Sequence, residues 1–174
     1  SIYIQKTSEF EVEIATNSRA MRDYEYTAKK PENTFRILML GDSFIEGFGV
    51  PVEDSLSKVL EGKLNRGGIE ARFEAINAGV GGYSPMLEYL ALMKMELLEL
   101  EPDLVILNFH AFSDVRDDYL YSQQAVFNKD GLPIRFKRKI RSEVLTLFRL
   151  SFDRASAALG QRDDLIVRTL KRVK

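Results

Sequence analysis

The chain has 174 residues, with 25 Lys and Arg against 26 Asp and Glu, one histidine (His110) and no cysteine. This length fits one domain with a real hydrophobic core, and a net charge of −1 argues against a chain that coats nucleic acid. The absence of cysteine excludes disulfides, thiolate zinc sites and a cysteine nucleophile, and the single histidine excludes a multi-histidine metal site.

The apolar pattern then predicts strands and helices in regular alternation. The first strand alternates apolar with polar or small residues, whereas the second and the last are continuous apolar runs typical of buried parallel strands. The helices end at Gly67-Gly68 and before Pro102. In chain order, the predicted elements are a strand over 10–15, a loop over 16–34, a strand over 35–40, a helix from Asp54 or Ser55 to Gly67, a strand over 73–76, a helix from Pro85 or Met86 to about Leu100, and a strand over 104–109.

This order is typical of a parallel sheet with crossover helices. We predict a three-layer α/β/α, flavodoxin-like domain over residues 34–174, preceded by an N-terminal extension with a β-strand over residues 1–33. A small hairpin over 126–136 and helical spacing over 140–152 and 163–173 follow. An open α/β domain normally has more than three strands, so we expect the sheet to be incomplete at the C-terminus.

Ligands bind at the carboxyl ends of the strands in such a sheet. Three predicted loops leave these ends, over residues 41–49, 77–85 and 110–118, and all three carry small or polar residues. Ser43 directly follows a buried strand, which would expose its hydroxyl beside backbone amides that can bind an oxyanion. An ordinary capped turn would also explain Gly-Asp-Ser at this place.

Residues 36–44 (RILMLGDSF) resemble the first block of the GDSL or SGNH hydrolases, a superfamily of esterases and acylhydrolases. In that family the serine of Gly-Asp-Ser is the nucleophile, which implies Ser43, with Asp42 beside it as a supporting residue. The second block places a glycine amide in the oxyanion hole, five residues after an asparagine that ends the second strand. The stretch NAGVGG, which starts at Asn77, implies Gly82 for that role.

The third block of the family is Gly-Xaa-Asn-Asp, and its asparagine is a further oxyanion donor. The corresponding stretch here is AFSD, so Asp114 matches as a supporting residue, Ser113 replaces the asparagine, and Phe112 stands where a glycine often lies. A serine hydroxyl reaches less far than an asparagine amide, and loss of one oxyanion donor can cost about 3–4 kcal/mol of transition-state stabilisation. The resemblance runs from about residue 17 to residue 118.

The family's catalytic base is a histidine near the C-terminus, with an aspartate three residues before it. The residue three before His110 is Leu107, so the given sequence contains no such pair. Two explanations stay open: the pair lies beyond Lys174 or was lost, or the chain is an inactive homologue. His110 itself would serve as the base only within hydrogen-bond reach of Ser43.

The resemblance implies a serine hydrolase that cleaves an acyl or acetyl ester of a small molecule or polymer. Ser43 would attack, the amides of Ser43 and Gly82 and the Ser113 hydroxyl would hold the oxyanion, and sequence beyond this chain would supply the base. One alternative is a non-catalytic module that binds carbohydrate or an acyl group. Another is a phosphoryl-transfer domain that uses Asp42, with Mg²⁺ held by the acidic side chains at 114, 117 and 118.

We expect no cofactor, because the glycine-rich loop departs from the dinucleotide pattern at Ser84, where its third glycine would fall. We also expect no metal, because a solvated loop after a strand explains the acidic side chains at 114, 117 and 118 better than a Mg²⁺ site does. The basic run over residues 135–141 fits a membrane surface or an anionic polymer, and also a solvated helix start. Residues 17–23 and 115–118 are similar to stretches of a bacterial branch that often has an N-terminal anchor or secretion signal. This similarity implies an anchor upstream of Ser1 and a location outside the cytoplasm, with the oligomeric state left open.

Overall fold

The computed structural model describes residues 2–68 and 70–136. The helices predicted over 140–152 and 163–173, and most of the basic run over 135–141, lie outside the described residues. The helices and strands are, in chain order, β1 (Ile2–Lys6), β2 (Glu11–Ala15), β3 (Thr34–Leu40), α1 (Ser43–Glu46), η1 (Val52–Asp54), α2 (Leu56–Asn65), β4 (Arg72–Asn77), α3 (Pro85–Lys94), η2 (Leu97–Leu100), β5 (Leu104–Leu107), α4 (Asp114–Ser122), β6 (Ala125–Phe127) and β7 (Pro133–Phe136).

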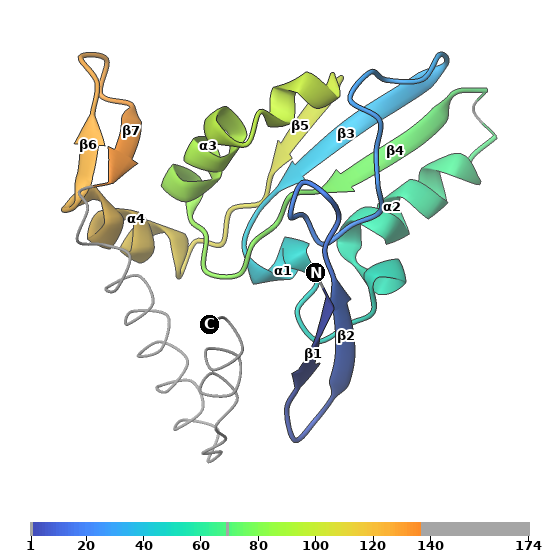
Figure 1. Cartoon of the computed structure of the whole chain (residues 1–174), viewed down its shortest axis with the longest axis horizontal. Helices are drawn as coiled ribbons and strands as arrows, with labels where there is room; N and C mark the ends of the chain where they lie inside the picture. Colours follow the sequence, from blue (N-terminus) through green and yellow to red (C-terminus); the bar gives the residue numbers. More distant parts are fainter. Residues whose placement is uncertain (1, 69, 137–174) are drawn as a thin grey trace.

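The centre of the fold is a parallel sheet of three strands in the order β4-β3-β5 (Figure 1). β3 pairs with β4 along Thr34 to Met39 and with β5 along Ile37 to Leu40. The first parallel strand therefore lies between the second and the third, as at the start of a flavodoxin-like sheet. This arrangement confirms the predicted α/β class and the central place of the 35–40 run.

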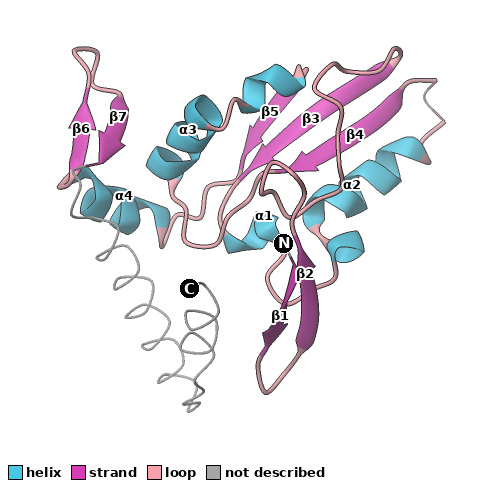
Figure 2. Ribbon diagram, in the orientation of Figure 1, coloured by secondary structure: helices cyan, strands magenta, loops and turns pink. Residues whose placement is uncertain are grey.

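Helices cover both faces of this sheet, α3 on one side and α2 on the other (Figure 2). Successive side chains of β3 point to opposite faces, as a strand requires. Leu38 packs in one core cluster with Leu100 of η2, whereas Ile37 packs in a second cluster with Leu60 of α2. The three layers thus follow from an apolar strand that is buried on both faces.

The helix predicted from residue 85 to residue 100 is interrupted, so that prediction is wrong in part. α3 ends at Lys94, and Glu96 adopts a left-handed φ of 53° before the 3₁₀-helix η2 begins. The turn places Leu97 and Leu100 in the core, where they are 1% and 0% exposed. Burial of each leucine contributes about 1.5–3 kcal/mol, so the two together exceed the cost of about 1–2 kcal/mol for the left-handed Glu96.

The strand predicted over residues 104–109 is shorter and more exposed than a central strand. β5 ends at Leu107, and the side chains of Leu104, Val105 and Leu107 are exposed. β5 lies at the edge of the sheet, with β3 as its only strand partner in the described part of the chain, so its apolar side chains lack neighbours on one flank. An apolar run alone does not distinguish a central strand from this edge strand.

Four elements were missed in the sequence, namely β1, α1, η1 and α4. β1 pairs antiparallel with the predicted strand β2, and α4 occupies part of the stretch expected as a loop over 110–118. The hairpin predicted around residues 128–131 is confirmed as β6 and β7. Among the described residues, no helix has both the length and the apolar character needed to cross a membrane.

Candidate functional site

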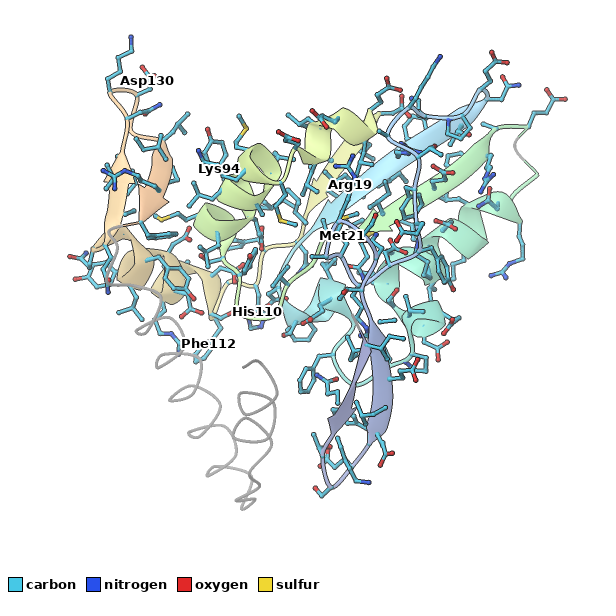
Figure 3. All side chains as sticks on the ribbon, viewed as in Figure 1. Arg19, Met21, Lys94, His110, Phe112 and Asp130 are labelled. Atoms are coloured by element: carbon cyan, nitrogen blue, oxygen red, sulfur yellow. The ribbon has the colours of Figure 1, made fainter. Side chains whose placement is uncertain are left out.

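The carboxyl ends of the three parallel strands bring the predicted loops together. The Asn108 N–H donates to the Leu40 carbonyl at 2.9 Å, and the Val80 N–H donates to the Gly41 carbonyl at 3.0 Å. The loop after β3 is thereby joined to the loops after β5 and β4. Figure 3 shows His110 below this end of the sheet, beside α1. The sheet topology therefore brings the three loops together at one edge of the sheet.

Ser43 is the first residue of α1, a single turn that begins directly after β3. The Asp42 carboxylate caps this turn, because its Oδ1 accepts from the Phe44 N–H at 2.9 Å. Gly47 ends the turn with a left-handed φ of 84°. Within the described residues, neither the hydroxyl nor the N–H of Ser43 has a hydrogen-bond partner. A half-buried serine with an unpaired hydroxyl can act as a nucleophile once a base takes its proton.

Gly82 lies in the loop between β4 and α3 and has a φ of 80°, which favours glycine. Its carbonyl accepts from the Tyr121 hydroxyl at 3.1 Å, and the preceding Gly81 N–H donates to Glu46 Oε2 at 2.9 Å. The Gly82 N–H itself has no acceptor in the part of the chain that the structure describes. Ser43 and Gly82 thus offer two unpaired N–H groups on adjacent loops, the kind of donor that an oxyanion hole uses.

His110 and Ser113 form a contact of their own. The atoms His110 Nδ1 and Ser113 Oγ are 2.6 Å apart, and Ser113 Oγ donates to Asp114 Oδ1 at 3.3 Å. Asp114 Oδ2 also accepts from the His110 N–H at 2.7 Å. The Ser113 hydroxyl is therefore engaged by its neighbours, and its role as an oxyanion donor stays a prediction.

His110 does not contact the nucleophile candidate through a hydrogen bond. Among the described residues no hydrogen bond joins it to Ser43, and its ring instead packs against the Phe44 ring with centroids 5.3 Å apart. The geometry required for His110 to act as the base of Ser43 is therefore not present.

The acidic residues considered as Mg²⁺ ligands form hydrogen bonds and ion pairs with other protein groups. Asp118 Oδ1 accepts from the Met86 N–H at 3.0 Å and from the Ser84 hydroxyl, so it caps the start of α3. Asp117 forms an ion pair with the neighbouring arginine. No group of three or more His, Asp or Glu side chains is arranged to hold a metal ion within the described residues. The phosphoryl-transfer alternative therefore lacks a preformed cation site in this part of the chain.

Glu88 is a buried carboxyl group that no sequence pattern singles out. It lies on α3 and is 1% exposed, and neither carboxylate oxygen has a hydrogen-bond partner among the described residues. Burial, and then the charges of Asp114, Asp42 and Asp118, raise its pKa to about 7. The sequence pattern of this leucine-rich helix is compatible with Glu88 on either the exposed or the buried face. Only the packing of α3 shows that the side chain points inward.

The raised pKa of Glu88 predicts a pH-dependent stability. Its ordinary pKa is 4.5, so the folded chain holds the proton more tightly than the unfolded chain, and the contribution to stability is lost as the pH rises from 4.5 to about 7. We expect Glu88→Gln to unfold at higher urea than the parent chain at about pH 8 and to differ little at about pH 4. The matched control is Glu99→Gln, which changes an exposed glutamate. An unaltered pH dependence in Glu88→Gln would contradict this account.

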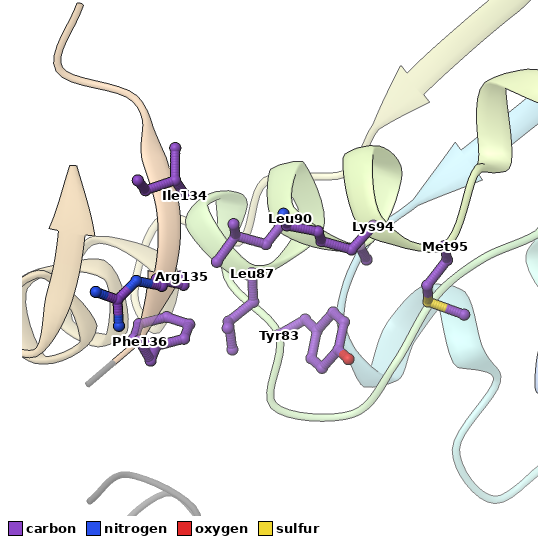
Figure 4. A pocket seen from close by; sticks show the side chains of 9 residues that line it. Tyr83, Leu87, Leu90, Lys94, Met95, Ile134, Arg135 and Phe136 are labelled. Carbon is purple, nitrogen blue, oxygen red and sulfur yellow. The ribbon is translucent and has the colours of Figure 1, made fainter. Parts of the chain in front are cut away.

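A cavity of about 320 Å³ lies between α3 and β7 (Figure 4). One of its lining residues is Tyr83, which directly follows Gly82 in the sequence. The lining consists mainly of apolar side chains, together with the cationic side chains of Lys94 and Arg135. The cavity was not predicted, because it depends on how the hairpin packs against α3. The lining residues are Tyr83, Leu87, Leu90, Ala91, Lys94, Met95, Ile134, Arg135 and Phe136.

Comparison with solved structures finds two forms of one esterase. The esterase AlinE4, described as an SGNH-hydrolase family esterase, is 31% identical over 54% of this chain and 46% of its own length, with a TM-score of 0.38. A mutant of AlinE4 is 32% identical over 53% of this chain and 45% of its own, also with a TM-score of 0.38. The match therefore spans less than half of either esterase chain. No family model and no curated protein matches this sequence.

Proposed function

We propose that this chain carries the nucleophile and part of the oxyanion hole of an SGNH-type serine hydrolase that cleaves an acyl or acetyl ester. The main support is the arrangement at the strand ends. Ser43 has an unpaired hydroxyl and N–H, and Gly82 has an unpaired N–H, within the described residues. The motif resemblance assigns the nucleophile to Ser43 and an oxyanion donor to Gly82.

In the proposed reaction, Ser43 Oγ bonds to the acyl carbon of the ester while its proton passes to a base. The carbonyl oxygen then carries a negative charge, which the N–H groups of Ser43 and Gly82 stabilise. Collapse of this intermediate breaks the ester C–O bond, and the leaving alkoxide takes the proton from the base. Water then attacks the acyl-serine, which releases the acid and restores the Ser43 hydroxyl. The proposal assigns the base to an Asp-Xaa-Xaa-His pair outside this sequence. Asp42 supports the nucleophile by capping α1, and Asp114 holds the turn after β5.

A fluorophosphonate probe tests this proposal, because it forms a covalent bond with an activated serine. We expect full-length protein to be labelled at Ser43, and Ser43→Ala to abolish labelling without lowering the urea midpoint of unfolding. Ser8→Ala, which changes an exposed serine of the hairpin loop, is the control and should be labelled normally. Absence of labelling in a protein with an intact Asp-Xaa-Xaa-His pair would contradict the hydrolase proposal.

A non-catalytic module that binds a carbohydrate or an acyl group is the second candidate. The engagement of Ser113 by His110 and Asp114 favours it, because that contact removes one of the three expected oxyanion donors. Retained binding of an acetylated oligosaccharide together with no turnover, in a protein that contains the base, would select this candidate over the hydrolase.

A further inference from the structure

The polar stretch expected as a loop over residues 16–34 packs against the candidate site. Arg22 and Asp23 in its middle are 3% and 7% exposed, which is unusual for charged residues in a connecting loop. Each of them contacts a different one of the two loops that carry the proposed catalytic groups.

Arg22 binds the turn that follows Ser43. Its Nη1 donates to the backbone carbonyl of Glu46 at 3.0 Å and to that of Gly47, and its Nη2 donates to the carbonyl of Val50. A guanidinium presents several donors in a fixed planar fork. It therefore holds these three backbone carbonyls in one arrangement.

Asp23 binds the start of the loop that contains Gly82. Its Oδ2 accepts from the Asn77 N–H at 2.6 Å, at the end of β4. Its Oδ1 lies 2.9 Å from Lys58 Nζ, which in turn donates to the Ala75 carbonyl at 2.8 Å. Lys58 and Asp23 are both buried, so this pair fixes the segment to β4.

Glu46 joins the two loops directly. Its backbone carbonyl accepts from Arg22, and its carboxylate Oε2 accepts from the Gly81 N–H at 2.9 Å. The next N–H along the chain is that of Gly82, the proposed oxyanion donor. A continuous path of hydrogen bonds therefore runs from the N-terminal segment through α1 to the peptide beside Gly82.

We propose that Arg22, Asp23 and Glu46 are positioning residues of the site, which fix the turn of Ser43 and the loop of Gly82 relative to each other. Oxyanion donors are effective when their directions are set before the reaction starts, and a displacement of about 1 Å can cost about a hundredfold in rate. This inference rests on the proposed function for its catalytic part. The bracing of the two loops stands without it.

Two variants of Glu46 separate positioning from charge. Glu46→Gln keeps a carbonyl oxygen that can accept from the Gly81 N–H, whereas Glu46→Ala removes the acceptor. In full-length protein we expect Glu46→Ala to lower kcat, and the rate of fluorophosphonate labelling, about tenfold to a hundredfold with little change in KM. Glu46→Gln should restore most of that loss.

Amide hydrogen exchange measures the bracing independently of any activity. Arg22→Lys keeps the positive charge but loses the planar fork of donors, and Glu46→Ala removes the acceptor for the Gly81 N–H. We expect either variant to speed amide exchange at Gly47, Val50 and Gly81 about tenfold or more, while exchange in β3 stays at the parent rate. Unchanged exchange at these amides, or equal labelling of Glu46→Ala and the parent, would overturn the positioning roles. An unlabelled parent protein with these exchange changes would instead contradict only the hydrolase proposal.

Discussion

Replacing Arg36 with alanine is expected to lower the free energy of unfolding by about 3–5 kcal/mol, the usual cost of breaking a buried ion pair. Arg36 lies in the central strand β3 and is 0% exposed. Its Nε and Nη2 donate to Glu74 Oε2 at 2.9 and 2.7 Å, and its Nη1 donates to the carbonyls of Thr27 and Leu100. The alanine variant leaves the buried Glu74 carboxylate and these carbonyls without their main partner.

Urea unfolding followed by circular dichroism measures this loss. Arg72→Ala is a matched control, because Arg72 Nη2 lies 3.5 Å from the other oxygen of Glu74 while its side chain is 69% exposed. An exposed partner contributes about 0–1 kcal/mol, so the control should change little. The double variant Arg36→Met with Glu74→Met should recover much of the loss, because it removes both buried charges. Equal losses for Arg36→Ala and Arg72→Ala would contradict the assigned role of the buried pair.

Arg36 also illustrates what the sequence can and cannot predict. The apolar run around it is sufficient to predict a central strand, and the order of the strands places the loops of Ser43 and Gly82 together at one edge of the sheet. Both inferences use periodicity and topology, which are local or general properties of the chain. The partner of Arg36 is Glu74, on another strand, and nothing near either residue indicates the pairing.

The same limit applies to the surroundings of the candidate site. Glu88 is buried because of how α3 packs, and Arg22 and Asp23 are buried because the N-terminal segment folds back over two loops. The polar composition of that segment predicts an exposed connection, and its charged side chains instead satisfy backbone groups of distant residues. The interruption of the helix at Glu96 follows in the same way from the burial of leucines that come after it.

Gly79→Ala is expected to destabilise the chain by about 3 kcal/mol, at the upper end of the usual cost of overpacking. A Cβ at Gly79 would lie 2.4 Å from the Glu46 N and 2.7 Å from the Ile45 carbonyl carbon, and these backbone atoms of α1 cannot rotate aside. The displacement of α1 would also move Ser43 away from Gly82. Urea unfolding measures the loss of stability. Gly62→Ala is the control, because a Cβ at Gly62 meets only ordinary van der Waals contacts. The control should be at least as stable as the parent, since alanine has a higher helix propensity than glycine by about 1 kcal/mol. The same urea midpoint of unfolding for Gly79→Ala and the parent would refute the close contact between Gly79 and α1.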